Sequence, residues 1–168
     1  MTMLTLEDFF MTYGDAQYAE LGIFIDLLRA LSMLHHTHHW QTMGPQFYGD
    51  HLLYQRLYEL ADGQIDGVGE KAVGLGSADL VLTRHSLENM RRFIEAVEDT
   101  GEVMDSPALK MAKRSLLAEK SFITAGERMM DQLKSKGLLT RGVEQLLGTI
   151  LDTHEGLVFL LKQRVASA

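Results

Sequence analysis

The sequence contains no cysteine. Disulfide bonds, iron–sulfur clusters and thiolate-bound zinc are therefore excluded, and a bound metal ion would have to use imidazole and oxygen ligands. The sequence also lacks an apolar run near the roughly 20 residues that cross a bilayer, and its first residues lack the basic segment that opens a secretory signal. These absences predict a cytoplasmic protein with no membrane span.

Positive charge is scarce as well. The chain has 16 Lys and Arg against 23 Asp and Glu, which gives a formal net charge of -7. Such a balance repels a phosphate backbone, so nucleic acid is not the expected partner. The 168 residues, of which 46% are hydrophobic, suit one domain with a real core over 1–168, with a short leader over 1–14.

Four long stretches carry apolar residues at spacings of three and four, the period of an amphipathic helix. A Gly44-Pro45 break separates the first two, since proline cannot sit inside a helix and disfavours helix in the residue before it. Ser106 and Pro107 are typical of a helix start, and Gly137 is typical of a helix end. The predicted helices cover 15–42, 50–75, 106–136 and 140–165.

A long connection, 77–105, joins the second helix to the third. It contains one amphipathic segment, 86–98, for which Ser86 is the expected N-cap. Four long helices with one such crossover, and no convincing strand, describe an all-α, ferritin-like four-helix bundle. The second helix also contains three glycines, and each lowers helix stability relative to alanine. Their presence predicts the close approach of another helix or of a ligand at these positions: Gly63, Gly67 and Gly69.

The histidines are concentrated, because five of the seven lie in one short segment: His35, His36, His38, His39 and His51. His39 precedes the Gly-Pro break and His51 follows it, so a tight turn between antiparallel helices brings these two imidazoles together. Asp66 and Glu70 follow four residues apart on one helix face, where both carboxylates can reach one cation. Imidazole and carboxylate ligands suit iron, manganese or zinc, and the spacing does not choose among them.

The distance along the second helix decides how such a site could close. His51 and Asp66 are 15 residues apart, which at 1.5 Å per residue is roughly 22 Å. One chain therefore cannot bring both to one metal centre. A second copy, packed with its second helix antiparallel about a two-fold axis, would bring the histidines of one subunit to the carboxylates of the other. The spacing thus points to a site shared across a homodimer interface.

Each of these residues also has a simpler interpretation. Spaced carboxylates such as Asp66 and Glu70 are as typical of a solvated helix face as of a metal site. The other histidines of the segment, His35, His36 and His38, are more often exposed or hydrogen-bonded core residues than ligands. Trp40 is most often an interface or core aromatic residue.

The same segment resembles the Dps miniferritins, the DNA-binding proteins from starved cells. The resemblance rests on the pattern HHW-x3-GP-x-F-x3-H, which is His38, His39, Trp40, Gly44, Pro45, Phe47 and His51, followed by Asp66, Glu70 and an AVGLG ending. It covers the first two helices in detail and the rest of the chain in pattern and length. In that family the HW histidine, the histidine after the turn and the D-x3-E pair form an inter-subunit ferroxidase centre. The resemblance therefore implies this role for His39, His51, Asp66 and Glu70.

The resemblance also implies a function. That function is ferroxidase activity: the protein would bind Fe(II), oxidise it and store the Fe(III) inside a hollow homo-oligomer. The oxidant would be peroxide or dioxygen, with peroxide favoured. The oligomer would be a dodecameric cage built from two-fold dimers, and it would protect against damage by peroxide and iron. Two alternatives stay open: a nucleoid protein that coats DNA, and a ferritin-like shell with no working centre.

The sequence departs from the family pattern beside the second histidine. Where the family commonly carries an acidic residue one turn later, this chain has Gln55, an amide that offers an oxygen without a charge. Gln55 is the expected additional ligand of a weaker second metal position. In that family an acidic cluster beside this position is associated with seeding the mineral. Here the cluster is sparse, because Leu52 and Arg56 occupy two of its positions and only Glu59 carries a negative charge. His36, one turn before His39, is a further candidate for holding or orienting a ligand.

DNA binding is not expected. Family members that bind DNA often use terminal tails rich in Lys and Arg, whose charge releases counterions from the phosphate backbone. The first basic residue here is Arg29, inside the first helix, and the last segment offers only Lys162 and Arg164. Arg91 and Arg92 are the candidate local basic patch. Iron handling, which the resemblance implies, is therefore the expected main function.

Overall fold

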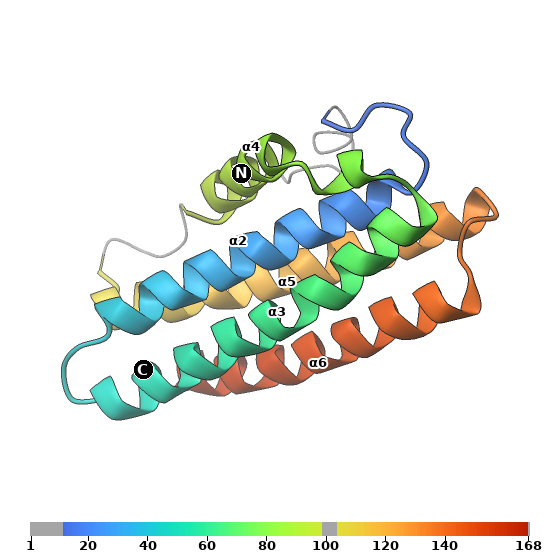
Figure 1. Ribbon diagram of the computed structural model, residues 1–168. Helices are drawn as coiled ribbons and strands as arrows, with labels where there is room; N and C mark the ends of the chain where they lie inside the picture. Colours follow the sequence, from blue (N-terminus) through green and yellow to red (C-terminus); the bar gives the residue numbers. More distant parts are fainter. Residues whose placement is uncertain (1–11, 99–103, 168) are drawn as a thin grey trace.

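A computed structural model describes residues 12–98 and 104–167 of the chain, and all regular structure in these ranges is helical. The long helices are α2 (Ala19–Gln41), α3 (Phe47–Leu75), α5 (Pro107–Ser135) and α6 (Arg141–Ala166). A short 3-10 turn, η1 (Ala78–Val81), and the helix α4 (Thr83–Glu98) lie in the crossover between α3 and α5. The predicted all-α four-helix bundle with one crossover is confirmed (Figure 1). Of the predicted leader, residues 1–11 lie outside the described ranges.

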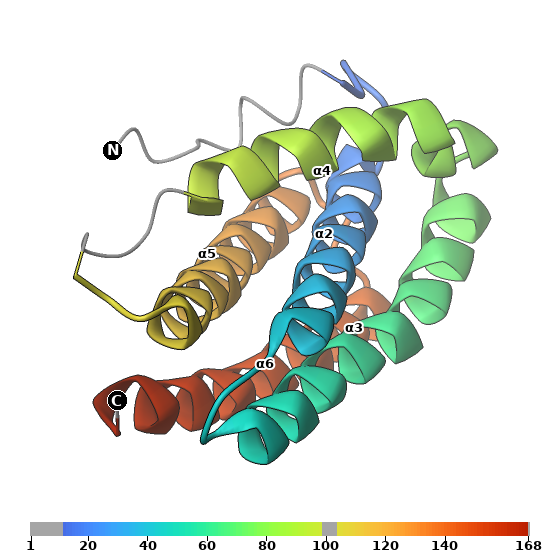
Figure 2. The ribbon, with the colours of Figure 1, turned by 90° about the vertical axis from the view of Figure 1, so that its left-hand side faces the viewer.

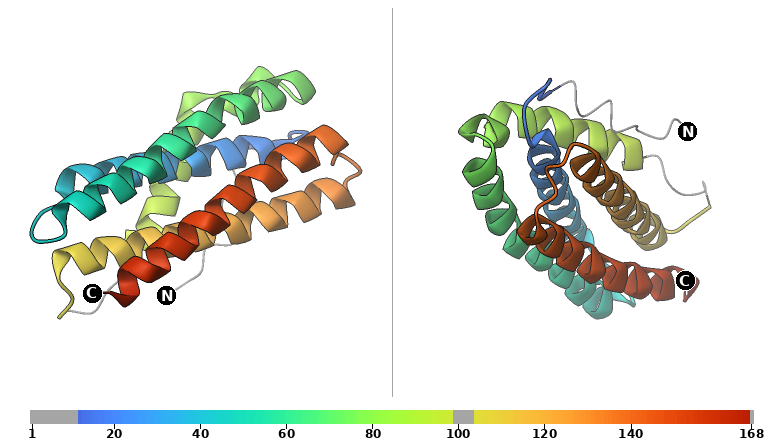
Figure 3. Two further views of the ribbon diagram at one scale, coloured as in Figure 1. Left: turned by 90° about the horizontal axis from the view of Figure 1, so that it is seen from below. Right: turned by 90° about the vertical axis from the view of Figure 1, so that its right-hand side faces the viewer.

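The bundle consists of two helical hairpins. The turn at Gly44-Pro45 makes α2 and α3 antiparallel, and α5 and α6 form the second hairpin. Seen end-on, α4 crosses the bundle on the outside, over α2 (Figure 2). The views along two other directions show that the α2–α3 turn and the C-terminal end of α6 lie at the same end of the bundle (Figure 3). An ion pair between Asp50 and Arg164 joins α3 to α6 there.

The predicted starts and stops of the second hairpin are confirmed. Ser106 caps α5, since its Oγ accepts a hydrogen bond from the Leu109 backbone N–H at 3.2 Å, and Pro107 occupies the first helical position. Thr140 caps α6 in the same way through the Val143 N–H. The chain leaves α5 through Gly137, whose φ of 70° lies in the left-handed region that favours glycine.

The expected cap of the crossover helix is wrong. α4 begins at Thr83, and the Ser86 N–H already donates to the Leu82 carbonyl, so Ser86 lies inside the helix. Its side chain is buried and donates to Asp26 of α2 while accepting from Arg29. Ser86 therefore attaches α4 to α2 instead of capping the N-terminus of α4.

The Asp26 carboxylate is the hub of this docking. It also accepts hydrogen bonds from the Tyr13 hydroxyl at 2.6 Å and from the Asn89 amide at 2.8 Å. Burial raises the pKa of Asp26, and these donors partly offset that rise. A fully buried carboxylate with several donors fixes where α4 and the chain before α2 meet the bundle.

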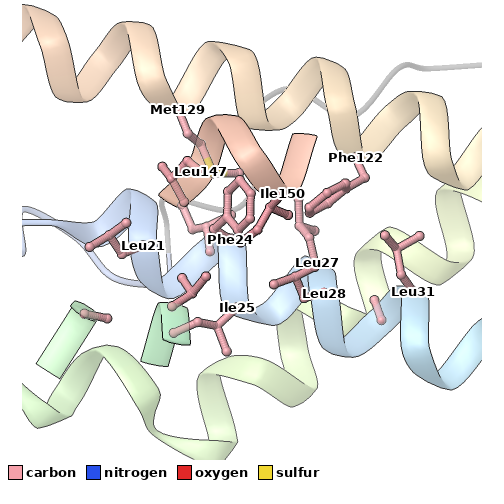
Figure 4. Close-up of a cluster of buried hydrophobic side chains, with 14 of the residues drawn as sticks. Leu21, Phe24, Ile25, Leu27, Leu28, Leu31, Phe122, Met129, Leu147 and Ile150 are labelled. Carbon is pink, nitrogen blue, oxygen red and sulfur yellow. The ribbon is translucent and has the colours of Figure 1, made fainter. Parts of the chain in front are cut away.

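The core is centred on α2, whose residues are buried on almost every side. Phe24 packs edge-on against Phe122 of α5, with ring centroids 5.0 Å apart (Figure 4). The close approach of helices occurs at Gly126, where an added Cβ would lie 2.6 Å from Leu151 and 3.1 Å from Phe24. The approach predicted at Gly63, Gly67 and Gly69 is not made within the chain: the first and third face open space, and Gly67 has only an ordinary contact with Leu146. No helix among the described residues is long and apolar enough to span a membrane.

Candidate metal centre

His39 and His51 lie together at the α2–α3 turn. His39 is in the last turn of α2 and His51 is near the start of α3, so the reversal at Gly44-Pro45 brings their rings into contact. The ring centroids are 3.7 Å apart and the planes differ by 27°. Both side chains are half-buried. The predicted juxtaposition of these two imidazoles is present within one chain.

The two histidines bind each other's backbone. His39 Nδ1 lies 3.0 Å from the His51 carbonyl oxygen, and His51 Nδ1 lies 3.1 Å from the His39 carbonyl oxygen. A carbonyl can only accept, so in both rings Nδ1 carries the hydrogen and donates it. The neutral rings then keep a lone pair on Nε2. Second-shell bonds of this kind orient a metal-binding histidine and fix which nitrogen is the ligand.

Stacking limits what the pair can hold. A metal ion lies in the plane of its imidazole ligand, about 2 Å from the nitrogen. The two rings lie face to face, with centroids 3.7 Å apart and planes only 27° from parallel, and do not converge on one point in this way. In this arrangement each ring offers its Nε2 as a separate potential ligand.

Further rings surround the pair. Phe47 stacks on His51, and Tyr58 meets His39 edge-on with centroids 5.4 Å apart. His36 lies between Tyr58 and Trp40, at 4.1 Å and 4.2 Å. His36 therefore orients neighbouring rings and has no hydrogen bond of its own among the described residues. Sequence reasoning missed Tyr58, although its position seven residues after His51 places it on the same flank of the helix.

Asp66 and Glu70 lie elsewhere on α3. Both are exposed, and they line an open groove of about 520 Å³ between α2 and α3, together with Arg29 and Val73. Among the described residues, no group of three or more histidines and carboxylates is placed to hold a metal ion. The chain thus brings the two histidines together and, separately, the two carboxylates.

Gln55 follows His51 by one turn of α3. Its amide nitrogen donates to Glu59 Oε1 at 2.8 Å, and both residues line an open hollow with Leu52 and Arg56. Glu59 thereby orients the Gln55 amide. The only carboxylate in this hollow is that of Glu59, which agrees with a thin acidic cluster at this place.

The remaining buried histidines form a polar cluster in the bundle centre. Glu119 of α5 is fully buried and lies 2.8 Å from His35 Nε2 and 2.6 Å from His154 Nδ1. Burial alone would raise the pKa of Glu119, but the hydrogen bonds and charges of His154 and His35 outweigh it and lower the pKa to about 2. His154 and Glu119 are titratable residues that the sequence did not single out as candidates for a site.

His38 extends this cluster. Its Nδ1 lies 2.8 Å from the Ser115 hydroxyl, which is also 3.3 Å from His35 Nδ1. Burial lowers the pKa of His38 to about 3, so the ring is neutral. Of the two simpler interpretations, exposed residue or hydrogen-bonded core residue, the second holds for His35 and His38.

Comparisons with known proteins agree on one family, although no family model matches the chain. The DNA protection during starvation protein 2 of Bacillus anthracis is 26% identical over 104 residues, which are 62% of this chain and 71% of that protein. The DNA protection during starvation protein of Brevibacillus brevis is 34% identical over 53 residues, 32% of this chain and 36% of that protein. The X-ray structure of Dps from Thermosynechococcus elongatus superposes with a TM-score of 0.68 at 17% identity, over 88% of each chain.

Proposed function

Since the chain belongs to the Dps family of ferritin-like proteins, we propose that it binds Fe(II) at centres shared by two subunits, oxidises it there, and stores Fe(III) in a hollow homo-oligomer. The observation that carries this proposal is the reciprocal pair of His39 and His51, whose Nε2 atoms are left as ligands. Asp66 and Glu70 of a second subunit would complete each centre. Gln55 would add a neutral oxygen.

The proposal needs a second copy, and the surface of the first hairpin supports one. Trp40 is 68% exposed and Tyr48 is 74% exposed, and other apolar side chains on α2 and α3 are also open to solvent. A gathering of exposed apolar groups is typical of an interaction surface. The open glycine positions on α3, at Gly63 and Gly74, leave room for another helix to approach closely. An antiparallel pairing of two α3 helices would use this face.

The chemistry of the donor set suits iron as substrate. Neutral imidazoles together with carboxylates bind Fe(II), and carboxylates favour the harder Fe(III) product. Each Fe(II) gives up one electron, and hydrogen peroxide takes two electrons and two protons to form two waters. A centre that holds two Fe(II) ions would therefore match one peroxide. Dioxygen takes two electrons and two protons to form hydrogen peroxide, or four of each to form two waters, so only its full reduction would need two centres or two turnovers.

The test is anaerobic Fe(II) titration followed by addition of peroxide. The variant His39→Ala/His51→Ala should lose fast oxidation while keeping its assembly, because the core is built from other residues. Asp66→Ala/Glu70→Ala should lose it too. Removal of another exposed acidic pair, Asp152→Ala/Glu155→Ala on α6, is the matched control and should leave the rate unchanged.

Mixed assemblies sharpen the test. If each centre spans two chains, co-assembling the histidine-deficient subunit with the carboxylate-deficient subunit should restore part of the activity. A site within one chain would give no rescue. Equal oxidation by the wild type and all variants would instead leave a ferritin-like shell without a working centre at these residues.

A further inference from the structure

We propose that Thr42 is a positioning residue, which holds His39 and His51 in the form whose Nε2 binds a divalent cation. Thr42 is the C-cap of α2 and is 7% exposed. Its hydroxyl donates to the His39 carbonyl at 2.9 Å and lies 3.4 Å from His51 Nδ1. Among the described residues, Thr42 is the one side chain hydrogen-bonded to both His39 and His51. The inference rests on the proposed function of that pair.

The direction of the Thr42 hydrogen bond decides the state of the neighbouring ring. A hydroxyl has one hydrogen, and Thr42 uses it on the His39 carbonyl. Only oxygen lone pairs are then left to face His51 Nδ1, as the His39 carbonyl does from 3.1 Å. With two acceptors beside it, this nitrogen must carry its hydrogen. The lone pair of His51 is thereby assigned to Nε2, on the side of the ring away from the turn.

The same hydroxyl fixes the place of the His39 carbonyl. That oxygen is in the last turn of α2, where the carbonyls have no helical N–H partner. It accepts from Thr42 and from His51, so the helix end and the ring are tied to one atom. The return bond from His39 Nδ1 to the His51 carbonyl closes the arrangement. Losing the Thr42 hydroxyl would remove one of the two side-chain hydrogen bonds to this carbonyl, and with it a restraint on both rings.

The size of the effect follows from known second-shell groups. Removing the partner that orients a metal-binding histidine commonly weakens metal affinity or activity by about 10–100-fold. Thr42→Val keeps the shape of the side chain and removes the hydroxyl, and Thr42→Ala removes it with less bulk. Thr42→Ser keeps the hydroxyl. Thr37→Val is the matched control, because the Thr37 hydroxyl also donates to a backbone carbonyl of α2, that of Met33, at 2.8 Å.

The experiment measures Zn²⁺ affinity of the assembled, iron-free protein by calorimetry, since Zn²⁺ binds without oxidation. Thr42→Val and Thr42→Ala should bind at least 10-fold more weakly than the wild type, and Thr42→Ser and Thr37→Val should bind like it. Ring ¹⁵N shifts of histidine-labelled protein should show a smaller share of the Nδ1–H form of His51 in Thr42→Val and an unchanged share in Thr42→Ser. A role confined to helix stability would shift the melting temperature without changing either readout.

The outcomes separate this inference from the function beneath it. Wild-type affinity in both hydroxyl-free variants overturns the role of Thr42 and leaves the metal centre standing. Equal Zn²⁺ affinity in the wild type and in His39→Ala/His51→Ala would overturn the centre itself. Weakened binding in Thr42→Ser equal to that of Thr42→Val would show that the methyl group, not the hydroxyl, matters, and also overturns the inference.

Discussion

Glu119 Oε2 lies 2.6 Å from His154 Nδ1 in the centre of the bundle, and neither side chain has any exposure. The other nitrogen of His154 lies 2.8 Å from the Gln64 side-chain oxygen, while the other oxygen of Glu119 lies 2.8 Å from His35. All four long helices therefore contribute to one polar cluster. A buried carboxylate is tolerated only with such partners.

Glu119→Ala should be among the most destabilising single changes in the chain. It leaves two buried imidazoles without their acceptor, and breaking a buried pair in this way costs about 3–5 kcal/mol. Glu127→Ala, an exposed carboxylate on the same helix, should change the free energy of unfolding by no more than about 0.5 kcal/mol. Denaturant unfolding at equal subunit concentration gives both values, and similar results for the two variants would contradict the structure.

The contribution of Glu119 should depend on pH in a stated direction. Its pKa is about 2 in the folded protein against a usual 4.5. Because the folded value is the lower one, the ionised carboxylate stabilises the fold fully above pH 4.5, and this stabilisation is lost as the pH falls from 4.5 towards 2. The difference in unfolding free energy between wild type and Glu119→Gln should narrow across that window. A difference that is constant with pH would refute the assignment.

Gly126→Ala should destabilise the bundle. The new methyl group would lie 2.6 Å from Leu151 and 3.1 Å from Phe24, and overpacking of this kind costs about 1–3 kcal/mol. Gly156→Ala is the control, because that helical position faces open space and should gain up to about 1 kcal/mol from helix propensity. Thermal unfolding should thus move in opposite directions for the two variants.

The protein should be much larger in solution than its 18.9 kDa chain. The shared centre requires at least a dimer, and the family resemblance implies a cage of twelve subunits. Light scattering measures this directly. A monomer at micromolar concentration would contradict both the cage and the shared centre.

Duplex DNA should not bind appreciably at neutral pH and physiological salt. The formal charge is -7 per chain, and the candidate basic patch is neutralised within α4, since Arg91 pairs with Glu88 and Glu95, and Arg92 pairs with Glu88. A gel-shift titration of the metal-free assembly tests this. Tight retention that weakens with salt would favour the DNA-coating function.

Local signals could be predicted from the sequence, and contacts between distant helices could not. Ser106, Pro107 and Thr140 act through neighbours three residues away or less, so their caps follow from the chain itself. Ser86 has the same local signal, but the buried Asp26 across the fold takes its hydroxyl. The pairing of His39 with His51 follows from the turn, whereas their exchange of bonds with opposite carbonyls needs the exact packing of that turn. Glu119 and His154 are on different helices and share no sequence pattern.

The two halves of the candidate centre differ in how firmly the fold holds them. His39 and His51 are bonded into the turn that joins two core helices, whereas Asp66 and Glu70 stand on an open face of α3. Changes at the histidines therefore alter the local geometry of this turn as well as metal binding. In the proposed centre, the exposed Asp66 and Glu70 can be exchanged at little cost to the chain, so its metal preference is most freely redesigned at these two positions.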